Sequence, residues 1–272
     1  MSGQAASGNT GRDLPMGASR LKGVLWDLDG TVMDSEPAWY EAESTLVERF
    51  GGDWSQEQAA GLLGSDLQRT AAVLQGAGVS LETRPLIEAL TEIVARRVLA
   101  SQPWRPGVRE ALVECRTAGV PCGLVSMSWR RFTWAVAGLV PGMFAAVVSG
   151  DDVTRGKPDP EAYLMGAAKL GLEPADCVAV EDSPTGVAAA RAAGITVIAV
   201  PGTTDAGKDL LSTGFGSLAE LGPGCEPGLT VLRSTAEISL ELLRQIHSGS
   251  SALDRQTTGI GPEKNTSRRA GL

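Results

Sequence analysis

Short apolar runs and longer helical patterns alternate along the chain from residue 21 to residue 200. The apolar runs predict strands at residues 21–27, 121–127, 145–150, 177–182 and 196–200. Strands that are apolar throughout are typical of parallel sheets, because helices cover both faces of such a sheet. The alternation therefore predicts an α/β fold with a Rossmann-like open parallel sheet. In such sheets ligands bind beyond the carboxyl ends of the strands.

Polar residues followed by proline indicate where two of the intervening helices begin. Asp159-Pro160 and Ser183-Pro184 each predict an N-cap with proline at the first helical position. Nearer the C-terminus, "LTVLRSTAEISLELLRQI" predicts a last strand and a last helix. Ser234 and Glu237 have the spacing of a capping box at the start of that helix.

One long interval interrupts the alternation. Residues 35–103 contain helical patterns without a convincing strand, and about seventy residues is too long for a simple crossover. We expect an inserted helical cap at 35–103, with the core formed by 21–34 and 104–247. The segments 1–20 and 248–272 are small, polar and glycine-rich, which predicts disordered tails.

Composition and charge exclude several classes of function. The chain is 43% hydrophobic and 21% charged, as in ordinary globular proteins, and its net charge of −8 argues against a nucleic-acid partner. The single histidine, His247, lies close to the C-terminus, and the four cysteines lack metal-binding spacing. Histidine-dependent triads and zinc sites are therefore not expected. Without a membrane span or an apolar signal core, we expect a cytoplasmic protein. The sequence does not address its oligomeric state.

Polar side chains follow four of the predicted strands and should converge on one edge of the sheet. They are Asp27 and Asp29, Ser126 and Ser128 with the backbone N–H groups from Met127 onward, Lys157, and the pair Glu181 and Asp182. Each of these alone is more typical of a turn, a surface loop or a helix start than of a site. Together, four carboxylates and one lysine leave a charge of about −3, which a divalent cation would compensate. Oxygen ligands favour Mg²⁺ over zinc.

The remaining donors form an anion site that suits a phosphoryl group. Ser126, the backbone after it, Lys157 and the metal would hold the phosphoryl oxygens. A carboxylate can then act as a nucleophile and form an aspartyl-phosphate, while a second carboxylate transfers protons.

The ordered motifs "DLDGT", "SMS", "GKPDP" and "EDSPTG" resemble those of the haloacid dehalogenase superfamily of phosphatases. The helical insertion after the first motif is similar to the C1-cap branch, which includes sugar-phosphate phosphatases, phosphoglycolate phosphatases and β-phosphoglucomutases. The resemblance covers residues 21 to about 202. It implies Mg²⁺-dependent hydrolysis of a small phosphorylated metabolite, with a sugar or sugar-alcohol phosphate as the expected substrate.

The resemblance also implies roles for individual residues. Asp27 would be the nucleophile and a magnesium ligand, and Asp29 would be the general acid/base with its main-chain carbonyl on the metal. Ser126 would bind the phosphoryl group and Lys157 would neutralise its charge. Asp182 would bind magnesium, with Glu181 beside it directly or through water. The backbone N–H groups of Gly30 and Thr31 would be phosphate donors.

Particular residues distinguish a phosphatase from three alternatives. Dehalogenases of the superfamily lack the aspartate found here as Asp29, and a non-catalytic binding module would be expected to have lost one of the motif carboxylates. The mutases of the branch carry a histidine in the first cap helix, where this chain has Trp39, and an arginine in the cap loop, where it has Leu67 with Arg69 nearby. These differences favour hydrolysis over the mutase reaction.

Several further side chains close to the motifs have two interpretations. Trp39 and Trp129 could stack on a sugar or pack between cap and core, and packing is favoured for Trp54. Arg105 and Arg155 are expected to be exposed to solvent.

Overall fold

The computed structural model of the protein describes residues 21–62, 65–200 and 228–249. The predicted N-terminal tail and almost all of the predicted C-terminal tail lie outside these residues. In the described part of the chain, no helix combines the length and apolar composition needed to cross a membrane.

The described residues form a six-stranded parallel sheet with the strand order β3-β2-β1-β4-β5-β6. The strands are β1 (Gly23–Trp26), β2 (Cys122–Val125), β3 (Phe144–Val148), β4 (Cys177–Glu181), β5 (Thr196–Ala199) and β6 (Leu229–Val231). All five strands predicted up to residue 200 are present, as is the last one near the C-terminus. Val24 pairs with both Cys122 and Val178, so β1 lies at the centre of the sheet.

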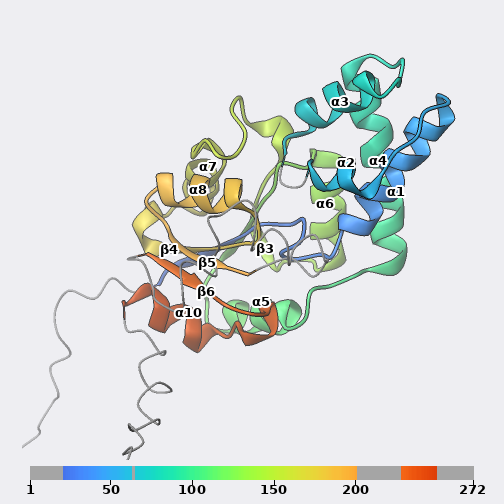
Figure 1. The fold of residues 1–272 in the computed structure, drawn as a ribbon. Coiled ribbons are helices and arrows are strands. Elements are labelled where there is room, and N and C mark those ends of the chain that lie inside the picture. Colours follow the sequence, from blue (N-terminus) through green and yellow to red (C-terminus); the bar gives the residue numbers. More distant parts are fainter. Residues whose placement is uncertain (1–20, 63–64, 201–227, 250–272) are drawn as a thin grey trace, which may run out of the picture.

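Helices cover both faces of the sheet, which explains why the strands are apolar throughout. In Figure 1, α7 (Glu161–Leu170) and α8 (Pro184–Ala192) lie above the sheet, and α5 (Val108–Thr117) and α10 (Leu240–His247) lie below it. Alternate residues of β1 point to opposite faces. Leu25 belongs to the hydrophobic cluster under α7 and α8, whereas Trp26 belongs to the larger cluster on the other face.

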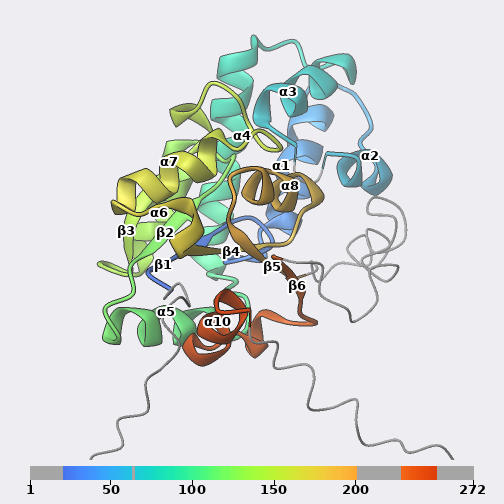
Figure 2. The ribbon, with the colours of Figure 1, turned by 90° about the vertical axis from the view of Figure 1, so that its left-hand side faces the viewer.

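The interval after β1 is helical, as predicted. It contains α1 (Glu36–Arg49), α2 (Gln56–Ala60), α3 (Leu67–Gly76) and α4 (Thr83–Ser101). These helices gather beside the sheet, and α4 packs against α1, α3 and α6 (Arg130–Leu139) (Figure 2). Their apolar side chains continue the larger cluster of the core. The division of the chain into core and cap therefore stays a prediction.

The predicted helix starts are partly correct. The Ser183 hydroxyl accepts a hydrogen bond from the Gly186 N–H at the start of α8, as expected for an N-cap. At α7, the prediction was wrong by one residue, because Pro160 is the N-cap, while Asp159 Oδ1 accepts from the Glu161 N–H at 3.0 Å.

The capping box near the C-terminus is present but starts a different element. Ser234 and Glu237 close a short 3₁₀ turn at Thr235–Glu237. The last helix, α10, is instead capped by Ser239. Further 3₁₀ turns lie at Gly150–Asp152 and Pro174–Asp176.

Three thiols lie inside the described part of the molecule. Cys115, Cys122 and Cys177 are buried and free, whereas Cys225 lies outside the described residues. Cys122 and Cys177 are the first residues of β2 and β4. Both therefore lie at the amino ends of the strands, away from the edge where the predicted site residues gather.

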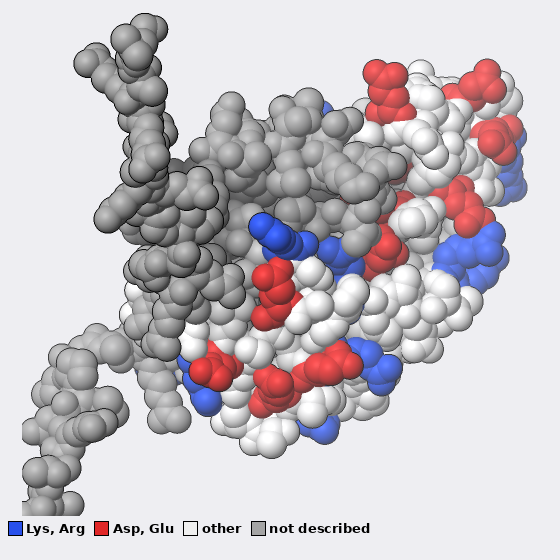
Figure 3. Space-filling model, turned by 60° about the horizontal axis from the view of Figure 1, so that its bottom comes forward, with Lys and Arg blue, Asp and Glu red and all other residues white. Residues whose placement is uncertain are grey.

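The exposed charges of the described surface are mixed in sign. On the face shown in Figure 3, acidic and basic side chains lie next to one another. The arginine pairs of the helices follow the same rule, since Arg96 and Arg131 both bind Glu92 while Arg130 binds Asp152. Exposed pairs of this kind contribute little to stability but keep the surface from presenting one sign of charge.

Candidate active site

Asp27 and Asp29 leave the central strand in the turn that follows it. The Asp27 N–H still donates to the carbonyl of Val180 at 3.0 Å, so this carboxylate is held by the sheet itself. Leu28 between the two aspartates is fully buried. The two carboxylates on either side of Leu28 therefore bind different partners, which are described below.

The turn is closed by Gly30, whose φ of +83° lies in the left-handed region. A Cβ at this position would lie 1.9 Å from Asp182 Oδ2, so glycine is required for the close approach of that carboxylate. The Gly30 N–H donates to the carbonyl of Met33 at 2.8 Å. The turn itself uses this N–H in the structure, and the role of Gly30 as a phosphate donor stays a prediction. The buried Thr31 hydroxyl donates to Asp182 Oδ1 at 3.4 Å.

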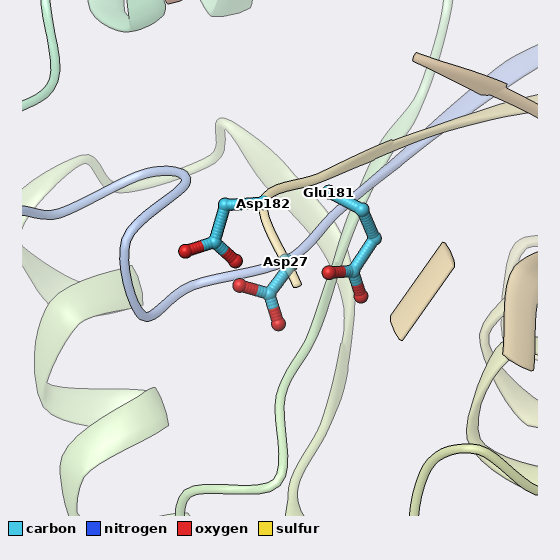
Figure 4. Close-up of side chains that lie close together, drawn as sticks. All are labelled: Asp27, Glu181 and Asp182. Carbon is cyan, nitrogen blue, oxygen red and sulfur yellow. The ribbon is translucent and has the colours of Figure 1, made fainter. Parts of the chain in front are cut away.

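Three carboxylates meet at the ends of β1 and β4. Asp27, Glu181 and Asp182 each offer an oxygen within 4.8 Å of the others, and Figure 4 shows their carboxylates lying close together. This donor set consists of oxygen atoms alone, which suits a hard divalent cation. The arrangement can therefore hold such an ion.

The electrostatics of these groups reflect burial and mutual repulsion. Burial raises the pKa of Asp27 to about 8, because the opposing effect of Lys157 is offset by the like charges of Glu181 and Asp29. Burial and the charges of Asp27 and Glu181 also hold the pKa of Asp182 well above its usual range. A bound cation would favour the ionised form of both aspartates.

Lys157 connects the carboxylates from the other side. Its buried ammonium donates to Asp27 Oδ1 at 2.7 Å, to Glu181 Oε1 at 2.6 Å and to the Val125 carbonyl at 3.0 Å. Burial disfavours its charge, but Asp27 and Glu181 outweigh that effect and raise the pKa of the lysine. All three ammonium protons are therefore directed before any substrate binds.

Glu181 has a partner that the sequence motifs did not identify. The hydroxyl of the buried Tyr163 donates to Glu181 Oε1 at 2.5 Å, and its ring lies 4.9 Å from the Lys157 ammonium. The Ser183 hydroxyl donates to Glu181 Oε2 at 3.2 Å. The only sequence signal for Tyr163 was its place on the apolar face of a helix. A Cβ on Gly186 would lie 2.0 Å from the Glu181 carboxylate, so that glycine leaves room for it.

Asp29 lies apart from the carboxylate cluster and accepts four hydrogen bonds. Ser35 and Trp39 donate to Oδ1 at 2.7 and 2.8 Å, while Ser126 and Ser128 donate to Oδ2 at 3.0 and 2.7 Å. Of these donors, Ser126 and Ser128 were predicted at this edge of the sheet, whereas Ser35 and Trp39 were not predicted to bind Asp29. The main-chain N–H of Ser128 also donates to the Ser126 hydroxyl at 2.9 Å.

Met127 lies between Ser126 and Ser128 and packs under the lysine loop. Its sulfur accepts from the Lys157 N–H at 3.3 Å, and a Cβ on Gly150 would lie 2.0 Å from its carbonyl oxygen. Met127 is thus in close contact with the Lys157 loop on one side and with Gly150 on the other. Phosphate binding by the backbone of Met127 stays a prediction.

A family model described as haloacid dehalogenase-like hydrolase matches residues 21–194. The chain belongs to this family. The matched range contains the three clustered carboxylates, Lys157 and Asp29, so the site lies wholly within the haloacid dehalogenase-like part.

Characterised relatives of this haloacid dehalogenase-like hydrolase include phosphatases. It is 40% identical over 196 residues to hexitol phosphatase A of Escherichia coli, covering 68% of this chain and 86% of the relative. It is 31% identical over 209 residues to a phosphorylated carbohydrates phosphatase of Thermotoga maritima, covering 74% and 94%. The crystal structure of CbbY from Rhodobacter sphaeroides with xylulose-(1,5)bisphosphate superposes with a TM-score of 0.68 at 25% identity, covering 82% and 99%.

Two arginines near the site of this haloacid dehalogenase-like chain differ in exposure. Arg155 is exposed, as expected, and pairs with Asp159 at 3.2 Å. The expectation for Arg105 was wrong, because this residue is only 4% exposed. Its N–H donates to the Val32 carbonyl at 3.0 Å, which draws the returning chain against the turn after β1.

Two tryptophans of the helical interval bind carboxylates. Trp54 is buried and donates to Glu43 Oε2 at 3.0 Å, which agrees with a packing role. Trp39 binds Asp29, a role that neither sugar stacking nor simple packing had anticipated. Trp129 is half-buried against the larger hydrophobic cluster.

Proposed function

We propose that the protein is a Mg²⁺-dependent phosphatase that hydrolyses a small phosphomonoester through an aspartyl-phosphate on Asp27. The observation that carries this proposal is the grouping of Asp27 with Glu181, Asp182 and Lys157 at the carboxyl edge of the sheet. The named activities of the hexitol and carbohydrate phosphatase relatives support a sugar or sugar-alcohol phosphate as substrate.

Magnesium would be held by Asp27 and Asp182 together with the main-chain carbonyl of Asp29, with Glu181 beside them. When bound, the ion would supply positive charge next to the phosphoryl oxygens. Lys157 holds Oδ1 of Asp27 and would share the same charge. Ser126 and the backbone after it would bind the remaining phosphoryl oxygens.

The chemistry proceeds in two displacements at phosphorus. In the first, a carboxylate oxygen of Asp27 bonds to phosphorus, and the bond from phosphorus to the ester oxygen breaks. The leaving oxygen keeps the electron pair and takes a proton from the Asp29 carboxyl. In the second, Asp29 takes a proton from water, the water oxygen bonds to phosphorus, and the bond to Asp27 breaks. Inorganic phosphate and the alcohol are the products.

A mutase reaction is the alternative, and it is not favoured. The two relatives above that are more than 30% identical are named as phosphatases. A mutase would convert β-glucose 1-phosphate to the 6-phosphate without net release of phosphate. Release of phosphate in proportion to substrate loss would therefore exclude it.

The decisive test of the hydrolase is replacement of the nucleophile. Purified protein with Mg²⁺ should release phosphate from hexitol and hexose phosphates, and Asp27→Asn should lower kcat by about 10³-fold or more. Asp176→Asn is a matched control, since Asp176 precedes β4 and binds the exposed Lys22 away from the site. The control should keep full activity. An Asp27→Asn variant with undiminished turnover would contradict the assignment.

A further inference from the structure

The hydrogen bonds to Asp29 come from two different parts of the chain. Oδ1 accepts from the start of α1, through the N-cap Ser35 and through Trp39, whereas Oδ2 accepts from the loop after β2, through Ser126 and Ser128. An ionised carboxylate offers about four lone-pair sites, so these donors satisfy the ionised form of Asp29. When Asp29 carries the proton that it transfers, one of the serine hydroxyls must turn away from the protonated oxygen. The position of the Asp29 carboxylate is therefore fixed jointly by α1 and by the sheet.

The side chain of Ser35 binds Asp29 and does not cap its helix, which is the usual role of a serine at a helix start. It is the N-cap residue of α1, but its side chain forms no capping hydrogen bond. Such a bond stabilises a helix by about 1 kcal/mol. The hydroxyl is instead fully buried and directed to Asp29 at 2.7 Å.

Trp39 lies four residues later and therefore on the same face of α1. Its indole ring meets the ring of Phe132 edge to face, with centroids 6.3 Å apart and an interplanar angle of 80°. Phe132 is fully buried in α6, so the direction of the indole N–H is set by packing in the core. An indole N–H donates and does not accept, and it cannot take the proton that Asp29 must transfer.

We propose that Ser35 and Trp39 are positioning residues that aim the carboxyl of Asp29 at the ester oxygen of the substrate. The inference rests on the proposed function, in which Asp29 donates a proton to that oxygen as its bond to phosphorus breaks. Proton transfer of this kind depends on a donor held within hydrogen-bond reach of the reacting atom. Loss of the indole N–H should therefore weaken catalysis in proportion to the substrate's need for a proton.

The test compares two aryl phosphates that differ in leaving group. Phenoxide needs protonation on departure far more than 2,4-dinitrophenoxide does. The ratio kcat/KM reports only steps up to the departure of the leaving group. For Trp39→Phe we expect kcat/KM to fall about 10-fold or more with phenyl phosphate and less than about 2-fold with 2,4-dinitrophenyl phosphate.

Trp54→Phe is the matched control for this variant. It also removes a buried indole–carboxylate hydrogen bond, at 3.0 Å to Glu43, without contact to Asp29. It should change kcat/KM for the two aryl phosphates by the same factor. Ser35→Ala is a second variant, with a smaller change in side-chain volume, and it should show the same selective loss. It keeps the test possible if Trp39→Phe fails to fold.

The outcomes separate the positioning role from the proposed function. Equal losses on both aryl phosphates, or no loss on either, in the folded variants would overturn the positioning role alone, because Asp27→Asn would still abolish turnover. Turnover that survives Asp27→Asn would overturn the proposed function and this inference together. A selective loss with phenyl phosphate in Trp39→Phe and Ser35→Ala, absent in Trp54→Phe, would establish the role.

Discussion

Glu181 is held by more donors than a metal ligand alone would require. It accepts from Lys157 and Tyr163 at one oxygen and from Ser183 at the other, and it is fully buried. The direct hydrogen bonds show that this carboxylate fixes Lys157, next to the place proposed for the cation. Tyr163 is thus part of the support for the site through its contacts with Glu181 and Lys157.

Tyr163→Phe removes the hydroxyl from Glu181 and keeps the ring beside Lys157. Hydrogen bonds to charged groups contribute about 1.5–3 kcal/mol, and we expect the free energy of unfolding to fall by about that amount. Denaturant unfolding measures it. The control is Tyr40→Phe, which removes the hydroxyl of the other tyrosine of the chain, a half-buried residue. Equal unfolding free energies for wild type and Tyr163→Phe would show that the bond is energetically neutral.

Gly30→Ala should damage the cation site specifically. The new Cβ would meet Asp182 Oδ2 at 1.9 Å, so that carboxylate must move. We expect Mg²⁺ affinity to fall about 10-fold or more, as changes to groups that orient metal ligands typically do. Isothermal titration calorimetry measures this affinity. Gly51→Ala provides the control, because Gly51 has a similar φ of +81° with nothing within 4 Å of its Cβ position. Unchanged affinity in Gly30→Ala would contradict the prediction.

At the scale of elements, the strands and helices could be predicted because their signals are local. Apolar runs identified the strands, and Ser183 identified the start of α8. The arrangement around Asp29 could not be predicted in the same way. Ser35 carried no signal of a site residue and Ser128 was expected only at the sheet edge, and the packing of α1 against the β2 loop directs both hydroxyls to one carboxylate. The capping box of Ser234 and Glu237 likewise starts a 3₁₀ turn where the sequence predicted a helix.

Helix α1 also carries a buried carboxylate that has no catalytic role here. Burial raises the pKa of Glu43 from 4.5 to about 7, although the Trp54 N–H opposes the shift. Between these values the folded protein binds more protons than the unfolded chain, so the stability of the fold decreases as pH rises. Above pH 7 the ionised Glu43 lowers the free energy of unfolding by about 3 kcal/mol.

Glu43→Gln should remove this pH dependence. We expect similar unfolding free energies for variant and wild type near pH 4.5, and a more stable variant at pH 8 by up to about 3 kcal/mol. Urea titrations across this range measure the difference. Glu41→Gln is the control, since Glu41 is exposed and binds Arg97. Parallel pH profiles for Glu43→Gln and wild type would contradict the predicted ionisation.

At the scale of the whole molecule, cation binding should stabilise the fold. Asp27, Glu181 and Asp182 repel one another at the edge of the sheet, and an ion that binds only the folded state shifts unfolding by mass action. At a Mg²⁺ concentration of 100 times Kd, we expect about 2.7 kcal/mol of added stability. Thermal unfolding with and without Mg²⁺ measures it, with NaCl at equal ionic strength as the reference. Asp182→Asn should lose most of the increment, and an equal increment in that variant would contradict the assigned site.

The broad architecture is confirmed, while some expectations for the molecule stay predictions. The parallel sheet and the family agree with the sequence motifs. The separation of core and cap, the cytoplasmic location and the absence of a nucleic-acid partner remain untested. These properties depend on motion, compartment or other molecules, which local patterns of residues do not encode.

The buried thiols at the amino ends of β2 and β4 can report independently on local opening of the sheet. Cys122 and Cys177 flank the central strand at the edge opposite the active site. A thiol-reactive reagent can modify them only when that edge separates, so the labelling rate of each thiol reports a local opening equilibrium. Comparison of these rates with and without Mg²⁺ would show whether cation binding at one end of the strands also reduces opening at their other end.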